Sequence, residues 1–266
     1  MAVISLTPAD LSIAALLIFI LGLVSIGQQL QFSRQLYVAA LRCTLQLLLM
    51  GLILQVLFSR GSLAAVLLMA AIMLLTAGQA TASRQERPFK GRWPFFISLA
   101  AMAISSFSVT MVALTVIIDI TPWYKPQYAI PLLGMLLGNT MNGVALSMDT
   151  LTSTVWQQRG IIEQQLMLGK TWPQAMNQLI KGAVRTGMTP ILNAMATTGI
   201  VSLPGMMTGQ ILSGTPPIEA VKYQILIMFL ITTGTGFGVL AVVRLSARHL
   251  FDERHRLRLD RLKVRG

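Results

Sequence analysis

Residues 62–82 read SLAAVLLMAAIMLLTAGQATA, a run without a single charged side chain. A helix crosses the hydrocarbon core of a bilayer in about 20 apolar residues, so this run is long enough to span a membrane. Inside a bilayer every backbone polar group needs a partner within the protein, and one isolated apolar segment meets that need only as a helix. The run therefore predicts a transmembrane helix.

Comparable apolar runs recur along the whole chain. Of the 266 residues, 54% are hydrophobic and 11% are charged, and the mean hydropathy of +0.68 lies outside the range of soluble globular proteins. We therefore predict an all-α, polytopic transmembrane helical bundle with about seven spans. The predicted spans cover residues 9–27, 39–58, 62–82, 94–118, 129–148, 188–208 and 222–244.

The positive charges indicate how this bundle is oriented. If the N-terminus lies outside and the loops alternate between sides, the inner side receives all 21 Lys and Arg residues except Arg60, Lys125 and Lys222. An excess of Lys and Arg marks cytoplasmic loops. The sequence thus predicts an outer N-terminus, a cytoplasmic C-terminus and a multi-pass protein of a bacterial inner membrane.

We expect one transmembrane domain over residues 1–266 with two additional cytoplasmic segments. These are a hairpin at about 150–186 and a basic tail at about 245–266. The net charge of +12 does not indicate a nucleic-acid partner, because the basic residues are not interleaved with stacking aromatics. The tail is expected to lie along the anionic inner leaflet, which makes membrane lipids its partners.

The hairpin centres on residues 161–176, IIEQQLMLGKTWPQAM, which are too polar for a span. Gly169 suits the left-handed residue that ends a helix. Thr171 suits the N-cap of a following helix, with Pro173 in its first turn. The stretch therefore predicts two helices joined by a tight turn, which we interpret as a docking element. The alternative is a solvated connector between two spans.

The spacing within the hairpin resembles a known motif. Glu163, Gln164 and Gln165, followed by Leu168 and Gly169, resemble the "EAA, two residues, LG" loop of ABC-transporter permeases, with two Gln in place of two Ala. In those permeases a short cytoplasmic helix docks into a cleft of the ATPase subunit. The stretch also carries two charged side chains, Glu163 and the long Lys170, and an aromatic residue, Trp172, of the kind that anchors protein interfaces. The predicted coupling residues are Glu163, Gln164, Gln165, Leu168, Gly169, Lys170 and Trp172.

Three further segments carry the resemblance over most of the chain. GMLLGNTMNGVAL (134–146), TGIVSLPGMMTGQILSG (198–214) and AVKYQI (220–225) resemble signature segments of the FetB-type iron-export permease family, which is related to plant aluminium-tolerance permeases. The resemblance implies a permease subunit of an ABC transporter that works as a homodimer with a separate ATPase. It also implies export of iron from the cytoplasm, with a role in metal homeostasis and oxidative-stress resistance.

The residues themselves give no indication of enzymatic chemistry. The chain contains no G-x-x-x-x-G-K-[ST] motif to hold ATP phosphates. The nine acidic residues are scattered, both His residues are in the tail, and Cys43 is the only cysteine. We predict a transport subunit that binds no cofactor itself, with ATP and Mg on its partner ATPase.

The fifth predicted span carries polar residues at helical spacing. Polar side chains are energetically costly against lipid, so we expect these residues to face the bundle interior and to line a substrate path. Amide and carboxylate oxygens suit a hard or borderline cation such as iron, although the metal and its ligands stay unknown at this stage. The alternative role is interhelical hydrogen bonding or capping. The residues of this face are Met135, Asn139, Asn142, Leu146 and Asp149.

The sixth predicted span is interrupted by Pro and Gly, and broken helices often line transport pathways. The alternative is a plain packing kink. The predicted pathway residues are Asn139, Asn142, Asp149, Ser202, Pro204, Gly205, Met206 and Met207. Other functions compatible with the sequence are a secondary metal-ion carrier, an importer of another metal or small solute, and a membrane scaffold.

Overall fold

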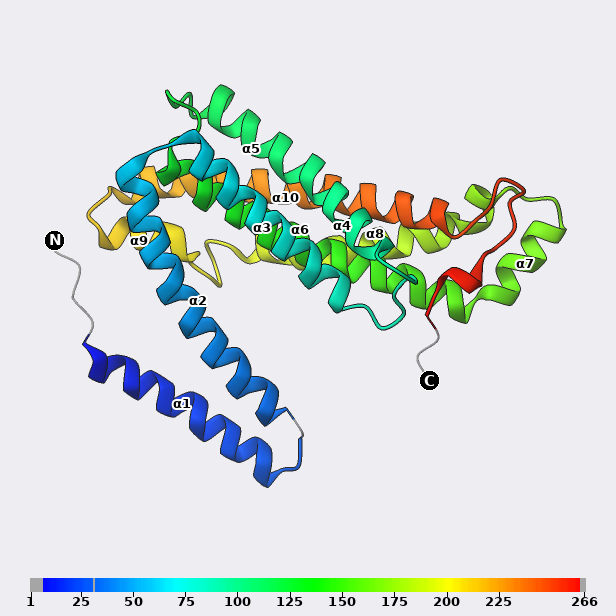
Figure 1. Cartoon of the computed structure of the whole chain (residues 1–266), viewed down its shortest axis with the longest axis horizontal. Coiled ribbons are helices and arrows are strands. Elements are labelled where there is room, and N and C mark those ends of the chain that lie inside the picture. The colour runs from blue at the N-terminus through cyan, green and yellow to red at the C-terminus, as the bar shows by residue number, and fades with distance from the viewer. Residues whose placement is uncertain (1–6, 31, 264–266) are drawn as a thin grey trace.

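The structure is a computed structural model that describes residues 7–30 and 32–263 (Figure 1). Within these ranges the regular structure is helical, with isolated β-bridges only. The helices and helical turns are α1 (Pro8–Gly27), α2 (Ser33–Arg60), α3 (Leu63–Ser83), α4 (Trp93–Met102), η1 (Ala103–Phe107), α5 (Ser108–Val112), η2 (Ala113–Ile117), α6 (Pro126–Gln157), α7 (Arg159–Met167), α8 (Trp172–Thr197), α9 (Gly205–Leu212), α10 (Pro217–His249) and η3 (Leu259–Arg261).

Six helices of the described chain are long and apolar enough to cross a membrane, so the all-α, multi-pass prediction is confirmed. The span that starts at Trp93 continues through η1, α5 and η2, where π-type turns widen the helix without breaking it. The six spans are Pro8–Gly27, Ser33–Ser59, Leu63–Ser83, Trp93–Ile117, Pro126–Gln157 and Pro217–His249.

The predicted span 188–208 is wrong as a single helix. α8 ends at Thr197, where the chain turns through Gly199 with a left-handed φ of +90°, and α9 starts only at Gly205 after Pro204. Besides the six spans, α8 also runs the length of the bundle, because its 26 residues extend about 39 Å. α8 contains many polar residues, so its hydropathy is too low for it to be identified as a membrane span from sequence.

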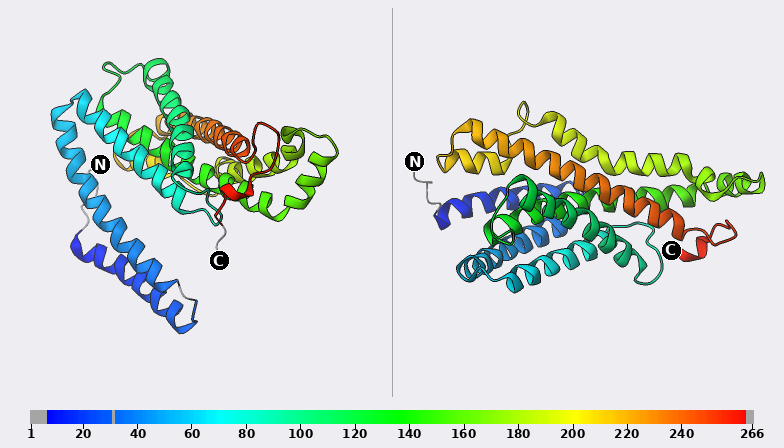
Figure 2. Two further views of the ribbon diagram at one scale, coloured as in Figure 1. Left: turned by 45° about the vertical axis from the view of Figure 1, so that its right-hand side comes forward. Right: turned by 90° about the horizontal axis from the view of Figure 1, so that it is seen from above.

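α8 lies beside α6 and α10 in all views (Figures 1 and 2). Counting it, the described chain runs seven times along the bundle, and its two ends lie at opposite ends of the molecule. At the end that carries the C-terminal tail lie the segments that follow α1, α3 and α6. This is the end at which the sequence places most positive charges, and we call it the basic end.

The core forms around α6 and α10, against which α3, α4 and α8 pack. α6 and α8 approach each other closely at Gly143 and Gly187. A Cβ added to Gly187 would lie 2.8 Å from the carbonyl oxygen of Gly143. Small residues at such a crossing let two backbones pack directly against each other.

α1 and α2 form a hairpin that leans away from the rest of the bundle (Figures 1 and 2). The two helices pack on each other, and the Tyr37 hydroxyl donates a hydrogen bond to the carbonyl oxygen of Phe19 at 3.0 Å. α2 reaches the bundle core near its C-terminal end, where Leu57 is buried. These two spans therefore leave most of their surface uncovered by the rest of the chain.

Candidate functional site

The hairpin of α7 and α8 has the turn that the sequence predicted. Gly169 follows α7 with a left-handed φ of +84°, and Thr171 caps α8 with Pro173 in the first turn. The Gln174 side-chain oxygen accepts a hydrogen bond from the backbone N–H of Thr171 at 3.0 Å. Backbone hydrogen bonds and a capping side chain thus fix the turn as a rigid unit.

The tip of this hairpin is apolar and exposed. Met167 and Leu168 are 80% and 81% exposed, whereas Ile162 on the same helix is buried. The hairpin extends past the end of α10 at the basic end of the molecule (Figure 1). Glu163, Gln164 and Lys170 are exposed beside the tip. A rigid element that presents two large apolar side chains outside the bundle has the form of a docking surface.

Trp172, which the sequence suggested as an interface anchor, makes its main contact within the chain. Its ring stacks on Phe251 of the tail, with centroids 5.7 Å apart and planes 23° apart. Phe251 is buried. Trp172 therefore holds the tail against the hairpin, and only part of its surface is left for a partner.

A cleft of about 630 Å³ separates the hairpin from the turn of the tail. Glu163, Gly169 and Lys170 line one side, and Arg254 and Arg256 line the other. Basic residues of the tail therefore lie across the cleft from the predicted coupling residues, and we did not predict them as part of this site from the sequence.

The tail packs against the segment before α4, and its expected position along the leaflet stays a prediction. Phe89 and Leu262 form an antiparallel β-bridge and are both buried. The backbone N–H of Lys90 donates to Arg261 O at 2.7 Å, and that of Lys263 donates to Pro88 O at 2.9 Å. Apolar burial thus outcompetes solvation of the basic segment. Residues 264–266 of the predicted tail lie outside the described residues.

Ion pairs within the tail stabilise this conformation. The Arg258 guanidinium donates hydrogen bonds to both Asp260 oxygens and lowers the pKa of that carboxyl to about 2. The backbone N–H of Arg256 donates to Asp252 and lowers the pKa of that carboxyl as well. Lowered carboxyl pKa values contribute stability above the unfolded pKa of 3.8 that is lost only as the pH falls below it. Both carboxylates therefore stay charged over the physiological pH range.

The three predicted pathway residues of α6 share one side of the helix. The Asn139 amide donates to Met135 O at 2.9 Å, one turn earlier in the same helix. Asn142 Oδ1 accepts from Arg84 Nη1 at 2.8 Å, and Asp149 Oδ1 accepts from the backbone N–H of Glu86 at 2.7 Å. From Met135 to Asp149 this polar stripe extends about 21 Å along the helix.

The segment after α3 contacts the half of the stripe nearer the basic end, and sequence reasoning missed it. Besides the contacts of Arg84 and Glu86, the Gln85 amide lies 3.3 Å from Met148 Sδ, and the Arg87 guanidinium lies 4.7 Å from the ring centroid of Trp156. The available signal was the charged run RQER directly after a span. Nothing in the spacing showed that it would pair with α6.

At the opposite end, Met135 and Met206 line the same pocket of about 250 Å³ between α6, α9 and α10. Gln210 also lines it, and its side-chain oxygen is buried without a hydrogen-bond partner. The structure thus joins the polar stripe to one residue of the second predicted pathway segment. Ser202, Pro204, Gly205 and Met207 do not line this pocket.

Within residues 7–30 and 32–263, no three His, Cys, Asp or Glu side chains come together as a metal site. The side chains along the stripe carry amide and carboxylate oxygens, with the Met135 thioether at the end farther from the basic end.

Comparison with known proteins agrees with this architecture. A family model described as the uncharacterised protein family UPF0014 matches residues 8–251. The chain belongs to this UPF0014 family. No solved structure matches it.

Three relatives of this UPF0014 protein cover most of its length. The UPF0014 membrane protein slr1647 of Synechocystis is 41% identical over 86% of this chain and 88% of its own. The probable iron export permease protein FetB of Escherichia coli is 29% identical over 97% and 98%. Protein ALUMINUM SENSITIVE 3 of Arabidopsis thaliana is 33% identical over 81% and 77%.

The polar stripe of this UPF0014 protein is only partly covered in the single chain. Asn142 and Leu146 are exposed on α6, whereas Asn139 and Asp149 are half-buried. α8 presents a second polar face, on which Lys181, Arg185 and Asn193 are exposed. Charged and amide side chains on spanning helices are costly against lipid and normally face protein or water. We therefore expect these polar faces to contact protein or water and not lipid.

Proposed function

We propose that this UPF0014 protein is the membrane-spanning permease subunit of an ABC transporter, which exports iron from the cytoplasm with ATP hydrolysed by a separate subunit. The observation that carries the proposal is the exposed apolar tip, Met167 and Leu168, on a rigid helical hairpin at the basic end. Burial of a Leu or Met side chain contributes about 1.5–3 kcal/mol, so a docked partner gains from covering the tip.

Transmission of motion follows from the same geometry. α8 is continuous from the capped turn at Thr171 to Thr197, so a displacement of the hairpin reaches the whole length of the bundle. α8 crosses α6 in direct backbone contact at Gly143 and Gly187. Closure of an ATPase on the hairpin thereby shifts α8 against the polar stripe.

A second copy of the chain supplies the cover that the polar faces need. In a two-fold symmetric dimer the stripe of α6 and the polar face of α8 would enclose a water-filled path between the copies. Arg84, bonded to Asn142, lies at the middle of the stripe and serves as the gate of this path. Met135 and Met206 lie at the outer end.

Iron as the substrate is supported by the resemblance to FetB-type permeases and by the name of the E. coli relative. The donors along the stripe agree with it, since carboxylate and amide oxygens bind hard or borderline cations. Export, rather than import, rests on the same resemblance.

Co-purification tests the docking step. We expect the cognate ABC ATPase, co-expressed with this chain, to co-purify with the wild type and to be lost in Leu168→Glu, because a charge replaces the apolar tip. Ile200→Glu is the matched control, since Ile200 is 89% exposed at the opposite end. Equal recovery of the ATPase with Leu168→Glu and with the wild type would refute the docking assignment.

A further inference from the structure

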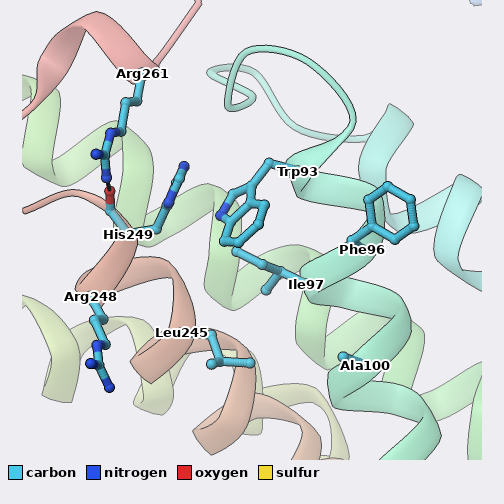
Figure 3. A pocket seen from close by; sticks show the side chains of 8 residues that line it. All are labelled: Trp93, Phe96, Ile97, Ala100, Leu245, Arg248, His249 and Arg261. Atoms are coloured by element: carbon cyan, nitrogen blue, oxygen red, sulfur yellow. Dashed lines mark hydrogen bonds between the residues drawn. The ribbon is translucent and has the colours of Figure 1, made fainter.

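A pocket of about 420 Å³ opens between α4 and α10 at the basic end, away from the docking hairpin and the polar stripe (Figure 3). Ile97 and Ala100 of α4 form one wall, and Leu245 of α10 forms the facing wall. Trp93 and Leu245 are 44% and 42% exposed, so the pocket opens sideways from two membrane-spanning helices. Its apolar part therefore faces the acyl chains of the bilayer.

The end of the pocket nearest the tail is aromatic and basic. The ring of Trp93 packs on the ring of His249, with centroids 4.4 Å apart. The Phe89 and His249 rings meet in an edge-to-face arrangement, with centroids 5.2 Å apart. Arg261 Nη1 donates to the carbonyl oxygen of His249, which places the guanidinium over the C-terminus of α10 (Figure 3). Arg248 lines the pocket from the last turn of α10.

Neither arginine is neutralised within the part of the chain that the structure describes. The ion pairs there are Lys222 with Glu219, Arg256 with Asp252, and Arg258 with Asp260. Asp260, next to Arg261 in sequence, is held by two hydrogen bonds from Arg258. A guanidinium carries five N–H donors, so Arg261 keeps donors for an anion after bonding to His249.

We propose that this pocket binds an anionic phospholipid of the cytoplasmic leaflet, with the phosphate at Arg261, beside His249 and Trp93, and an acyl chain along Ile97, Ala100 and Leu245. Basic pockets between spanning helices on the cytoplasmic side suit anionic headgroups, and Trp at this depth is typical of the membrane interface. A soluble phosphate would use Arg261 and leave the apolar wall without an occupant.

The lipid would join three segments that are far apart in sequence. Trp93 follows the loop after α3, His249 ends α10, and Arg261 belongs to the tail that also packs against the docking hairpin through Phe251. A bound lipid would therefore hold the tail in its docked position and, with it, the base of the hairpin. This inference does not depend on the identity of the transported substrate or on the ATPase.

Native mass spectrometry of the full chain in detergent, with added phosphatidylglycerol or phosphatidylcholine, tests the proposal. We expect phosphatidylglycerol to be retained in preference, and its affinity to fall about fivefold in Arg261→Gln. Arg254→Gln is the charge-matched control and should retain the lipid. Arg254 is exposed in the same tail and does not line the pocket.

Ala100→Trp tests the acyl part of the site without touching the tail. Ala100 is exposed on α4, so the larger ring should be accommodated while it fills the pocket. We expect weaker retention of phosphatidylglycerol, and no displacement of the lipid by soluble glycerol phosphate. Equal retention in all variants would overturn the proposal. Displacement by glycerol phosphate with Ala100→Trp unaffected would also overturn it, in favour of a soluble anion.

Discussion

Asn142 is an amide on a membrane-spanning helix whose oxygen accepts a hydrogen bond from the guanidinium of Arg84. The sequence placed Asn142 on a polar face, and that face exists. The partner could not be predicted, because Arg84 is separated from it by 58 residues and lies just beyond the end of α3. Periodicity identifies which residues share a side of a helix, whereas contacts between helices depend on how the helices pack.

The Arg84–Asn142 pair should act as a unit in a double-mutant cycle. Each single change, Arg84→Gln or Asn142→Ala, removes the same hydrogen bond, so the double variant should lose less than the sum of the two. We expect a coupling of about 1 kcal/mol in the free energy of unfolding, because the pair is exposed to solvent. Additive effects on both unfolding and transport would show that the pair is no gate.

At the scale of single helices, α8 shows why hydropathy alone does not identify every helix that runs along the bundle. A window of about 20 apolar residues finds helices that lipid surrounds, because lipid selects their side chains locally. α8 instead carries Lys181 and Arg185 on one side and small residues on the side facing α6, so its mean hydropathy is low. The Gly169 and Thr171 turn was predictable because capping depends on a few adjacent residues.

Gly187 should be intolerant of any larger side chain. In Gly187→Leu the new side chain would meet the Gly143 carbonyl at the α6–α8 crossing, and we expect a loss of about 1–3 kcal/mol in stability. Gly182→Leu on the same helix is the control, because no atom lies within 4 Å of an added Cβ there. Thermal unfolding in detergent measures both, and equal melting temperatures would contradict the packing described.

At the scale of the whole molecule, the described chain passes seven times along the bundle and leaves three faces wholly or partly uncovered: the α1–α2 hairpin, the polar stripe and the hairpin tip. Six of the seven passages were predictable from the apolar runs. The return of the tail onto Pro88 and Trp172 was not, because it rests on buried contacts between distant segments.

Orientation is directly testable with single cysteines in a Cys43→Ser background. Ser213→Cys lies at the outer end and His255→Cys at the basic end, and both positions are exposed. We expect a membrane-impermeant maleimide added to intact cells to label position 213 but not 255, with 255 labelled after permeabilisation. The reverse pattern would place the docking hairpin outside and exclude a cytoplasmic ATPase as its partner.

The central claim is that ATP hydrolysis on a separate subunit drives iron through this permease by way of the hairpin. Uptake of iron into inside-out vesicles that contain the chain and its cognate ATPase measures this directly. We predict ATP-dependent accumulation with the wild type and with Ile200→Glu, and none with Leu168→Glu. Iron accumulation that is absent with ATP, or unchanged in Leu168→Glu, would contradict it.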